Sequence, residues 1–377
     1  MSILKVDELQ SRTSGNRITL PDVNNYPPYR NLIINGDMSI AQRGTSQASI
    51  TSNGYYTVDR WYIGNSNLGT FTMSQDTDVP TGQGLAKSLK LDCTTADASP
   101  SSSDYLFLQT KFEGQNLQQI KKGTSNAESL TLSFWVKSNK TGTYIAELFD
   151  TDNTRQISQS YTINSASTWE KKTITFAGDT TGTLNNDNGE SFRLFFHLGA
   201  GSAFTSGTLS TTWTSSTNTD RAVGQVNLAD NTANEWYITG VQLEVGTSAT
   251  PFEHITFDMN LLRCQRYYHK TYNLSDAPAS NTFTGHLDIS GFSDGSNNLL
   301  FAIPHKVRMR TTPTVTYYTS GGTSGQWYYG RNGASGNSTA TSYSGRTAEN
   351  NLSTYVNIGA SWTGGFVAGH YTLDAEL

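Results

Sequence analysis

Most of the chain, from residue 31 to about residue 257, consists of short segments separated by polar turns, with hardly any helical period. In LTLSFWV (130–136) apolar residues alternate with polar ones as far as Trp135, and in FRLFFHL (192–198) the even-numbered positions are all apolar. Successive side chains of a β-strand point to opposite faces, so such segments bury one face. Further segments lie at 143–149, 172–176 and 235–245, with turn residues between them. Strands at this spacing without intervening helices predict an all-β protein built on an antiparallel sandwich.

The composition agrees with exposed β-sheet and argues against several functions. Hydrophobic residues make up 35% and charged residues 15%, but aromatic residues reach 11%. The formal net charge is −5 without long runs of either sign, which argues against nucleic-acid binding, because phosphates require concentrated Lys and Arg. The basic cluster HKVRMR (305–310) is interpreted as a solvated strand end. The N-terminus has no apolar core of signal-peptide length and no segment could span a bilayer, so we expect the protein to be made and kept in a cytoplasm, or released by lysis.

The chain divides into four parts. Residues 1–30 are expected to form an extended arm, since their apolar residues are sparse and three prolines follow; a disordered tail is the alternative. Residues 31–257 form the sandwich, 258–272 a connecting helix and 273–377 a second, smaller β-domain. The stretches 94–104 and 199–220 are predicted to be long loops or edge strands, and 319–348 a loop region rich in Gly, Ser and Tyr.

The helix predicted at 258–272 carries an apolar stripe. Phe257, Leu261, Cys264, Tyr268 and Tyr272 recur every three or four residues. A helix of this length is not stable alone, so the stripe must pack on something. Leu261, Cys264 and Tyr268 are therefore expected to contact either a neighbouring domain or sister chains. Cys264 and the other cysteine, Cys93, imply no disulfide framework.

Several phrases, taken together and in order, resemble tail-fibre and related virion surface proteins of tailed bacteriophages. They are LKVDELQSRT (4–13), NLIINGDM (31–38), QRG (42–44), DRW (59–61), ITGVQLEVG (238–246), ATPFE (249–253), CQRYY (264–268) and the final DAEL (374–377).

The resemblance implies more than the strand pattern does. It implies a jelly-roll sandwich of the kind found in carbohydrate-binding modules, a homotrimer, and an N-terminal arm fixed to other virion proteins. The apolar residues Ile3, Leu4, Val6 and Leu9 would anchor that arm. The C-terminal domain would face the host. It also implies a structural calcium near the first and last strands, with Asp37 and Glu244 as oxygen ligands; the alternative is that both are turn acids bonded to backbone.

Aromatic residues are the candidates for contact with a glycan. Trp61, Trp135 and Trp236 lie in strand patterns and are expected in the core. The candidate receptor site instead consists of four aromatic residues in the Gly- and Ser-rich region: Trp327, Tyr328, Tyr329 and Tyr343. Aromatic faces stack on sugar rings while neighbouring polar groups meet the hydroxyls. The alternative is that these rings form the small core of the C-terminal domain or a trimer contact.

No catalytic constellation is visible, so the chain is predicted not to be an enzyme. The six histidines are scattered without metal-type spacing, and no nucleophile or phosphate-binding motif occurs. The leading hypothesis is a tail-fibre-type subunit on the virion surface that attaches to host glycans. Two alternatives remain: a head decoration or adaptor protein that joins other virion components, and a free glycan-binding lectin.

Overall fold

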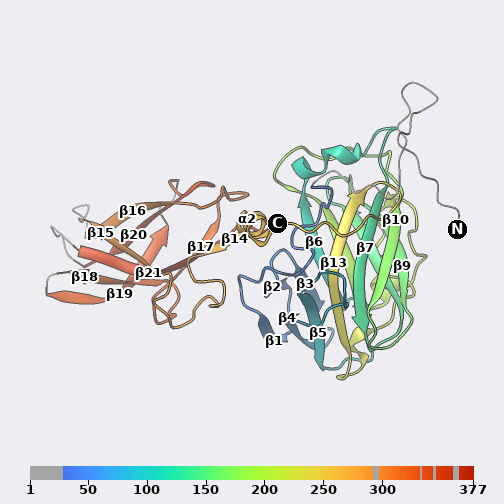
Figure 1. Cartoon of the computed structure of the whole chain (residues 1–377), viewed down its shortest axis with the longest axis horizontal. Coiled ribbons are helices and arrows are strands. Elements are labelled where there is room, and N and C mark those ends of the chain that lie inside the picture. Colours follow the sequence, from blue (N-terminus) through green and yellow to red (C-terminus); the bar gives the residue numbers. More distant parts are fainter. Residues whose placement is uncertain (1–28, 292–296, 332, 343–344, 360–364) are drawn as a thin grey trace, which may run out of the picture.

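The computed structural model describes residues 29–291, 297–331, 333–342, 345–359 and 365–377. Two β-domains lie next to each other along the long axis, with a short helix and the C-terminus between them (Figure 1). The prediction of an antiparallel jelly-roll sandwich, a helix and a second, smaller β-domain is confirmed. Within the described ranges, no helix has the length and apolarity needed to cross a membrane.

The sandwich consists of two antiparallel sheets whose neighbouring strands are mostly far apart in the sequence. The six-stranded sheet has the order β1 (Ser46–Ile50), β4 (Thr70–Asp76), β5 (Ser88–Thr95), β13 (Glu235–Val245), β7 (Leu130–Ser138) and β10 (Glu170–Phe176). The seven-stranded sheet has the order β12 (Thr214–Ser215), β9 (Arg155–Ile163), β8 (Gly142–Asp150), β11 (Glu190–Ala200), β6 (Tyr105–Glu113), β3 (Tyr62–Ser66) and β2 (Gly54–Tyr55). Short helical turns occur in the connections: η1 (Gly114–Asn116), η2 (Gln118–Ile120), α1 (Ser202–Thr205), η3 (Asn218–Asp220) and η4 (Leu228–Asp230).

The core lies between the two sheets and follows the alternation of the sequence. Even-numbered residues of β7 and β11 point inward, and Phe196 of β11 contacts Phe134 of β7 with a ring-centroid distance of 5.0 Å. Trp61 and Trp236, both fully buried, lie 6.3 and 6.1 Å from the same Phe196 ring. The expectation that these two tryptophans belong to the core is confirmed.

The C-terminal domain is organised around one long strand, β21, which pairs with β14, β15, β17 and β18. Its strands are β14 (Tyr268–Lys270), β15 (Leu287–Gly291), β16 (Asn298–Pro304), β17 (Thr314–Tyr318), β18 (Gln326–Arg331), β19 (Ala334–Ser342), β20 (Asn351–Asn357) and β21 (Gly365–Asp374). The prediction of a loop region at 319–348 is therefore wrong, since β18 and β19 form a hairpin there. Gly and Ser are abundant in this hairpin, but its backbone is paired with neighbouring strands.

The helix is shorter than predicted. Helix α2 spans Phe257–Gln265, and the chain then enters strand β14 rather than continuing to residue 272. Pairing with β21, in which Tyr268 lies opposite Asp374, replaces the helical hydrogen bonds. Tyr268 is therefore not on the helix, although it and Cys264 are buried against the rest of this chain while Leu261 is half-buried. The burial of Cys264 and Tyr268 within this chain agrees with the alternative that these residues contact a neighbouring domain rather than sister chains.

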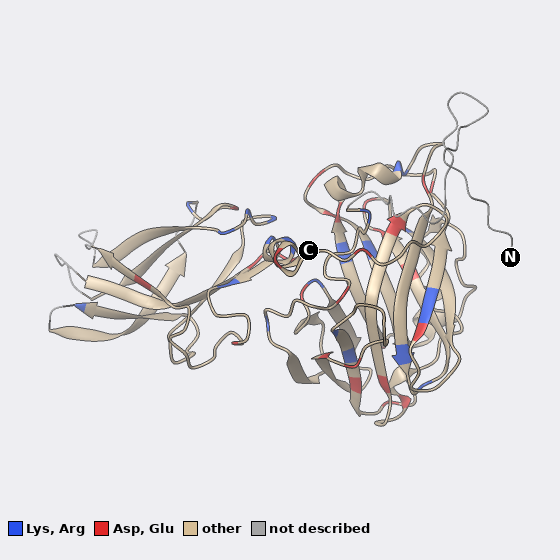
Figure 2. Ribbon diagram, in the orientation of Figure 1, with Lys and Arg blue, Asp and Glu red and all other residues tan. Residues whose placement is uncertain are grey.

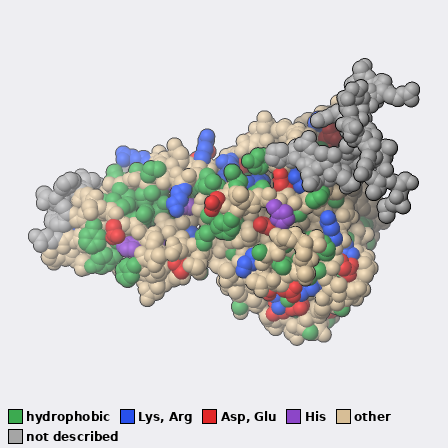
Figure 3. Space-filling view, viewed as in Figure 1, with side chains coloured by type: hydrophobic (Ala, Val, Ile, Leu, Met, Phe, Trp, Pro, Cys, Tyr) green, Lys and Arg blue, Asp and Glu red, His purple; other side chains and the backbone are tan. Residues whose placement is uncertain are grey.

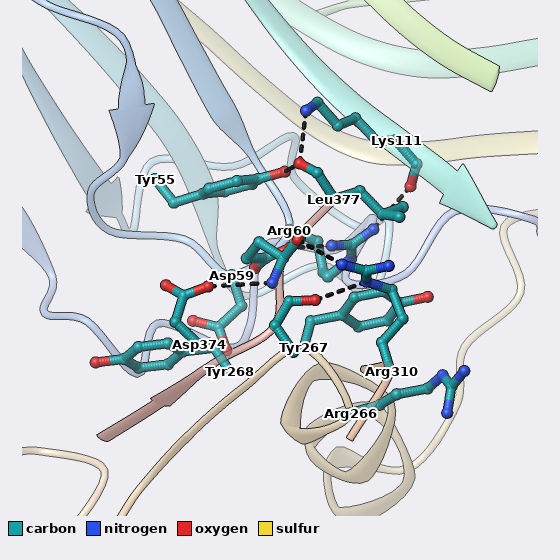
Figure 4. A network of polar contacts seen from close by, with 12 residues as sticks. Tyr55, Asp59, Arg60, Lys111, Arg266, Tyr267, Tyr268, Arg310, Asp374 and Leu377 are labelled. Atoms are coloured by element: carbon teal, nitrogen blue, oxygen red, sulfur yellow. Dashed lines mark hydrogen bonds and ion pairs between the residues drawn. The ribbon is translucent and has the colours of Figure 1, made fainter. Parts of the chain in front are cut away.

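The two domains are joined by a polar cluster, here called the junction network (Figure 4). After β21 the chain returns to the sandwich, where the buried Arg60 forms an ion pair with Glu376. Lys111 Nζ donates to the carbonyl of Leu377 at 2.5 Å, and Arg43 pairs with Asp374 at 3.0 Å. The guanidinium of Arg60 also lies 3.5 Å from the centre of the Tyr267 ring. The phrases QRG, DRW, CQRYY and DAEL of the sequence thus meet at one place, and their contacts serve to attach the domains to each other.

Charged residues of both signs are spread over both domains (Figure 2). On the face shown in Figure 3, hydrophobic side chains are more frequent on the C-terminal domain than on the sandwich. The exposed large hydrophobic residues include Phe257, Met259 and Leu262 of α2, which are 49%, 38% and 43% exposed. Helix α2 therefore presents an apolar surface next to the junction network.

Candidate functional site

The structure describes three of the four aromatic residues of the predicted receptor site, and it places them in different environments. Trp327 is fully buried on β18, where its indole stacks on Phe301 at 5.3 Å and its Nε1 donates to the carbonyl of His370 at 2.7 Å. Its assignment to a ligand-binding surface is wrong, and the alternative that it belongs to the core is correct. The burial follows from the hairpin, which turns Trp327 toward the interior.

The two described tyrosines of the set, Tyr328 and Tyr329, have different surroundings from Trp327. Tyr328 is half-buried and lies 6.0 Å from the ring of Phe366, which is 38% exposed. Tyr329 is partly buried and packs against the core of this domain. Tyr343 lies outside the described residues, as do Ile3, Leu4, Val6 and Leu9 of the arm. A role of Tyr328 in binding therefore stays a prediction.

Asp37 and Glu244 belong to two separate hydrogen-bond groups. Asp37 accepts from Ser39 Oγ at 3.0 Å and from Asn260 Nδ2 at 3.0 Å. Glu244 accepts from the backbone N–H and the hydroxyl of Thr250 at 2.9 and 2.7 Å. In the described ranges no three His, Cys, Asp or Glu side chains are grouped so that they could hold a metal ion. The donor set does not fit calcium as these residues stand, and calcium binding stays an untested prediction.

A groove of about 450 Å³ lies on the outer face of the six-stranded sheet. Its floor contains Trp135 and Ser133 of β7, Lys171 of β10 and Gly240 of β13. One wall is the loop 82–85 and the other is the segment 249–254. Trp135 is half-buried, so part of its indole is open to the groove. We refer to this feature as the Trp135 groove.

A β-bulge on β13 makes room for the exposed indole. The pairing of β13 with β7 shifts register between Thr239 and Gln242, and Gly240 lies there with a φ of +61°. A side chain at this position would be strained, and its Cβ would lie 3.2 Å from Trp135 Cδ1 and 3.0 Å from Leu85 Cδ1. Glycine at 240 therefore keeps the floor of the groove open beside the tryptophan.

The second wall is held by the last strand of the sandwich. Gln242 Oε1 accepts from the backbone N–H of Glu253 at 2.8 Å, and Glu244 holds Thr250 as described above. Arg30 Nε also donates to Thr250 Oγ1 at 2.8 Å. The role of Glu244 is thus to fix the segment that carries Phe252 and His254, whose rings lie 5.0 Å apart in an edge-on arrangement. The wall is positioned by partly buried hydrogen bonds although it has no regular secondary structure.

The chemistry of the groove suits a ligand with apolar faces and hydroxyl groups. Trp135 supplies a flat apolar surface, and Ser133, Gln83 and Lys171 supply donors and acceptors around it. None of the groove's lining residues is acidic. Sequence reasoning missed this site because it grouped Trp135 with Trp61 and Trp236 as core. The signal was present, since Trp135 occupies an odd-numbered position in a strand whose even-numbered residues point inward.

The outer face of the seven-stranded sheet carries a buried charge cluster that could be mistaken for an acid–base site. Glu147 accepts from Arg221 Nε at 2.8 Å and contacts His197 Nε2 at 2.7 Å. Burial lowers the pKa of His197. Burial alone would raise the pKa of Glu147, but Arg221 and His197 outweigh it, so this pKa lies below its usual value. Both oxygens of the fully buried Glu147 are occupied, so the cluster functions as an internal ion pair.

Comparisons with known proteins give only distant structural likenesses. No family model matches the chain, and no curated protein matches its sequence.

Among solved structures, the enzymatically active domain of bacteriophage CBA120 tailspike protein 4 is 14% identical, with a TM-score of 0.31. The match covers 58% of this chain and 22% of that one. The family 11 carbohydrate-binding module from Clostridium thermocellum, in complex with a mixed-linked tetrasaccharide, is 10% identical with a TM-score of 0.28, covering 56% of this chain and 99% of the module. TmCBM61 in complex with β-1,4-galactotriose is 10% identical with a TM-score of 0.30, covering 57% and 99%. The chain spans about a fifth of the tailspike's length, and likeness at this level says nothing about ligand or role.

Proposed function

We propose that this chain is a non-enzymatic structural protein of a tailed-phage particle, of the tail-fibre type, and that its sandwich binds a host-surface glycan in the Trp135 groove. The observation that carries the glycan-binding part is the half-exposed indole on the floor of a polar groove. The proposal that the chain belongs to a virion rests on the sequence phrases that resemble tail-fibre proteins. Four of these phrases, QRG, DRW, CQRYY and DAEL, come together in the junction network. This places the proposed receptor site on the sandwich instead of the C-terminal domain.

Replacing Trp135 by alanine is expected to abolish glycan binding while leaving the fold intact. Stacking of an aromatic ring on a sugar is a large part of the contact area in such a site, so affinity should fall at least about tenfold. The purified protein would be screened against a panel of bacterial surface glycans, and the affinity for the best ligand compared between wild type and variant.

The matched control is Trp169→Ala. Trp169 is a half-buried tryptophan that packs against Tyr237 and donates to Asp78 at 2.8 Å, outside the groove lining. It should keep wild-type affinity. If no glycan binds, or if Trp135→Ala binds as well as wild type, the receptor role of the groove is wrong; the former result favours the adaptor alternative.

We also propose that the arm anchors the protein to other virion proteins and that the chain forms a homotrimer through the apolar surface of α2. Exposed Phe257, Met259 and Leu262 support self-association there, since large exposed apolar patches mark contact sites. Deleting residues 2–24 should leave a trimer in light scattering that no longer enters virions. A monomer at micromolar concentration would contradict the trimer, and normal incorporation would contradict the anchor.

A further inference from the structure

A second hollow, of about 400 Å³, lies where residues 29–34, the turns η1 and η2, and helix α2 meet. Arg263, Arg266 and Tyr267 line one side of it. Gln115, Asn116 and Gln119 of the turns η1 and η2 also line it. This volume lies within the range typical of sites for small ligands. We refer to it as the Arg263 pocket.

One of the two arginines in the pocket is already neutralised. Arg266 forms a two-pronged pair with Glu113, with Nε–Oε1 at 2.8 Å and Nη2–Oε2 at 2.7 Å. Glu113 also accepts from Tyr267 and from Gln115, so its two oxygens are fully used. The charges of Arg266 and Glu113 therefore cancel locally and leave no carboxylate for another cation.

Arg263 has no such partner. Its guanidinium makes no hydrogen bond and no ion pair with any of the described residues, although it is half-buried. Burial lowers its pKa, which reflects the cost of removing an unpaired charge from water. The carboxylate that affects it, Glu253, is engaged by the backbone N–H groups of Tyr29 and Asn31. A carboxylate from outside, bound by both prongs of the guanidinium, would satisfy this group.

We propose that the Arg263 pocket binds an acidic sugar residue, with the sugar carboxylate on Arg263 and the sugar hydroxyls on the carboxamides of Asn116 and Gln119. The side chains of Asn116 and Gln119 make no hydrogen bond with the described part of the chain, so their donors and acceptors are available to hydroxyls. This inference rests on the proposed glycan-binding function but concerns a different site. It predicts that the recognised glycan contains a uronic acid or another sugar with a carboxylate.

The test is a calorimetric titration of the full-length protein with free glucuronic acid, with glucose and acetate as comparison ligands. Wild type should bind glucuronic acid at least about tenfold more tightly than either comparison ligand, and added salt should weaken binding. Arg263→Gln should lose at least about tenfold in affinity without a change in melting temperature, and Arg263→Lys should lose less because it keeps the charge.

Trp135→Ala separates this proposal from the proposed function. It should bind glucuronic acid like wild type even where it loses the larger glycan, because Trp135 does not line this pocket. Equal affinity for glucose and glucuronic acid, or unchanged affinity in Arg263→Gln, would overturn the acidic-sugar site. Acetate bound as tightly as glucuronic acid would overturn the sugar assignment and leave a general carboxylate site.

Discussion

Trp327→Ala is expected to lower the free energy of unfolding of the C-terminal domain by about 3–5 kcal/mol, the usual cost of deleting a fully buried tryptophan. The indole stacks on Phe301, meets Tyr317 edge-on at 6.0 Å and packs directly on the backbone of Gly369, where an added Cβ would lie 2.4 Å from the ring. Its loss also leaves the carbonyl of His370 without the Nε1–H donor. Trp327 is the only tryptophan in the described core of this domain, so its removal deletes the largest side chain of that core.

Chemical unfolding followed by tryptophan fluorescence and circular dichroism would measure this loss. Tyr328→Ala is the matched control, because the neighbouring half-buried ring contacts Phe366 instead of filling the core. It should cost about 1 kcal/mol or less. A stable Trp327→Ala variant, with an unfolding midpoint close to that of wild type, would contradict the packing described for β18.

Arg60→Ala is expected to destabilise the junction by about 2–5 kcal/mol, because the buried carboxylate of Glu376 loses its shorter ion pair and keeps only Arg43, whose Nη1 lies 3.4 Å from Oε1. Arg60 is 1% exposed, and Glu376, its partner, is 5% exposed in its side chain. The same guanidinium donates to the carbonyl of Lys111 at 2.7 Å. Removing the arginine therefore weakens the attachment of residues 374–377 to the sandwich, leaving the contacts of Arg43 and Lys111.

Differential scanning calorimetry of Arg60→Ala should show two separate transitions, or one transition at a clearly lower temperature. The double variant Arg60→Met, Glu376→Leu replaces the ion pair by two apolar side chains. It should recover part of the lost stability, since both charges of the pair are then removed together. Lys121→Ala serves as the control, because its pair with Glu128 is exposed at 53% and 37% and should contribute less than about 1 kcal/mol. If Arg60→Ala behaves like Lys121→Ala, the junction network does not hold the domains together.

The sequence predicted the class of the fold but assigned two tryptophans to the wrong environments. Alternation is a local property, so 130–136 and 192–198 became strands with the expected inward faces. The same alternation places Trp135 outward, but a general preference for buried tryptophan was given more weight. Trp327 lies among Gly and Ser residues, and its burial depends on β21, which is forty residues further along the chain.

The end of the helix could not be predicted for a similar reason. The stripe at 257–272 continues with the right period, and only the pairing of β14 with β21 shows that residues 268–270 are a strand. The candidate site was missed because its walls, at 82–85 and 249–254, have no pattern of their own and are brought together by the fold. Contacts between segments that are far apart in the sequence thus determine both the end of the helix and the walls of the Trp135 groove.

The return of the chain to the sandwich has a mechanical consequence. The C-terminal domain is attached covalently through the segment after α2 and a second time through residues 374–377, which Arg43, Arg60 and Lys111 hold. Arg310 adds to this second attachment by donating to the carbonyls of Asn188, Ala375 and Glu376 at 2.9, 2.7 and 2.9 Å. A single covalent connection would leave the domain free to rotate about that connection, whereas a second attachment restricts this rotation. A force applied to one domain is therefore transmitted to the other through both attachments, with less bending between the domains than one connection would permit.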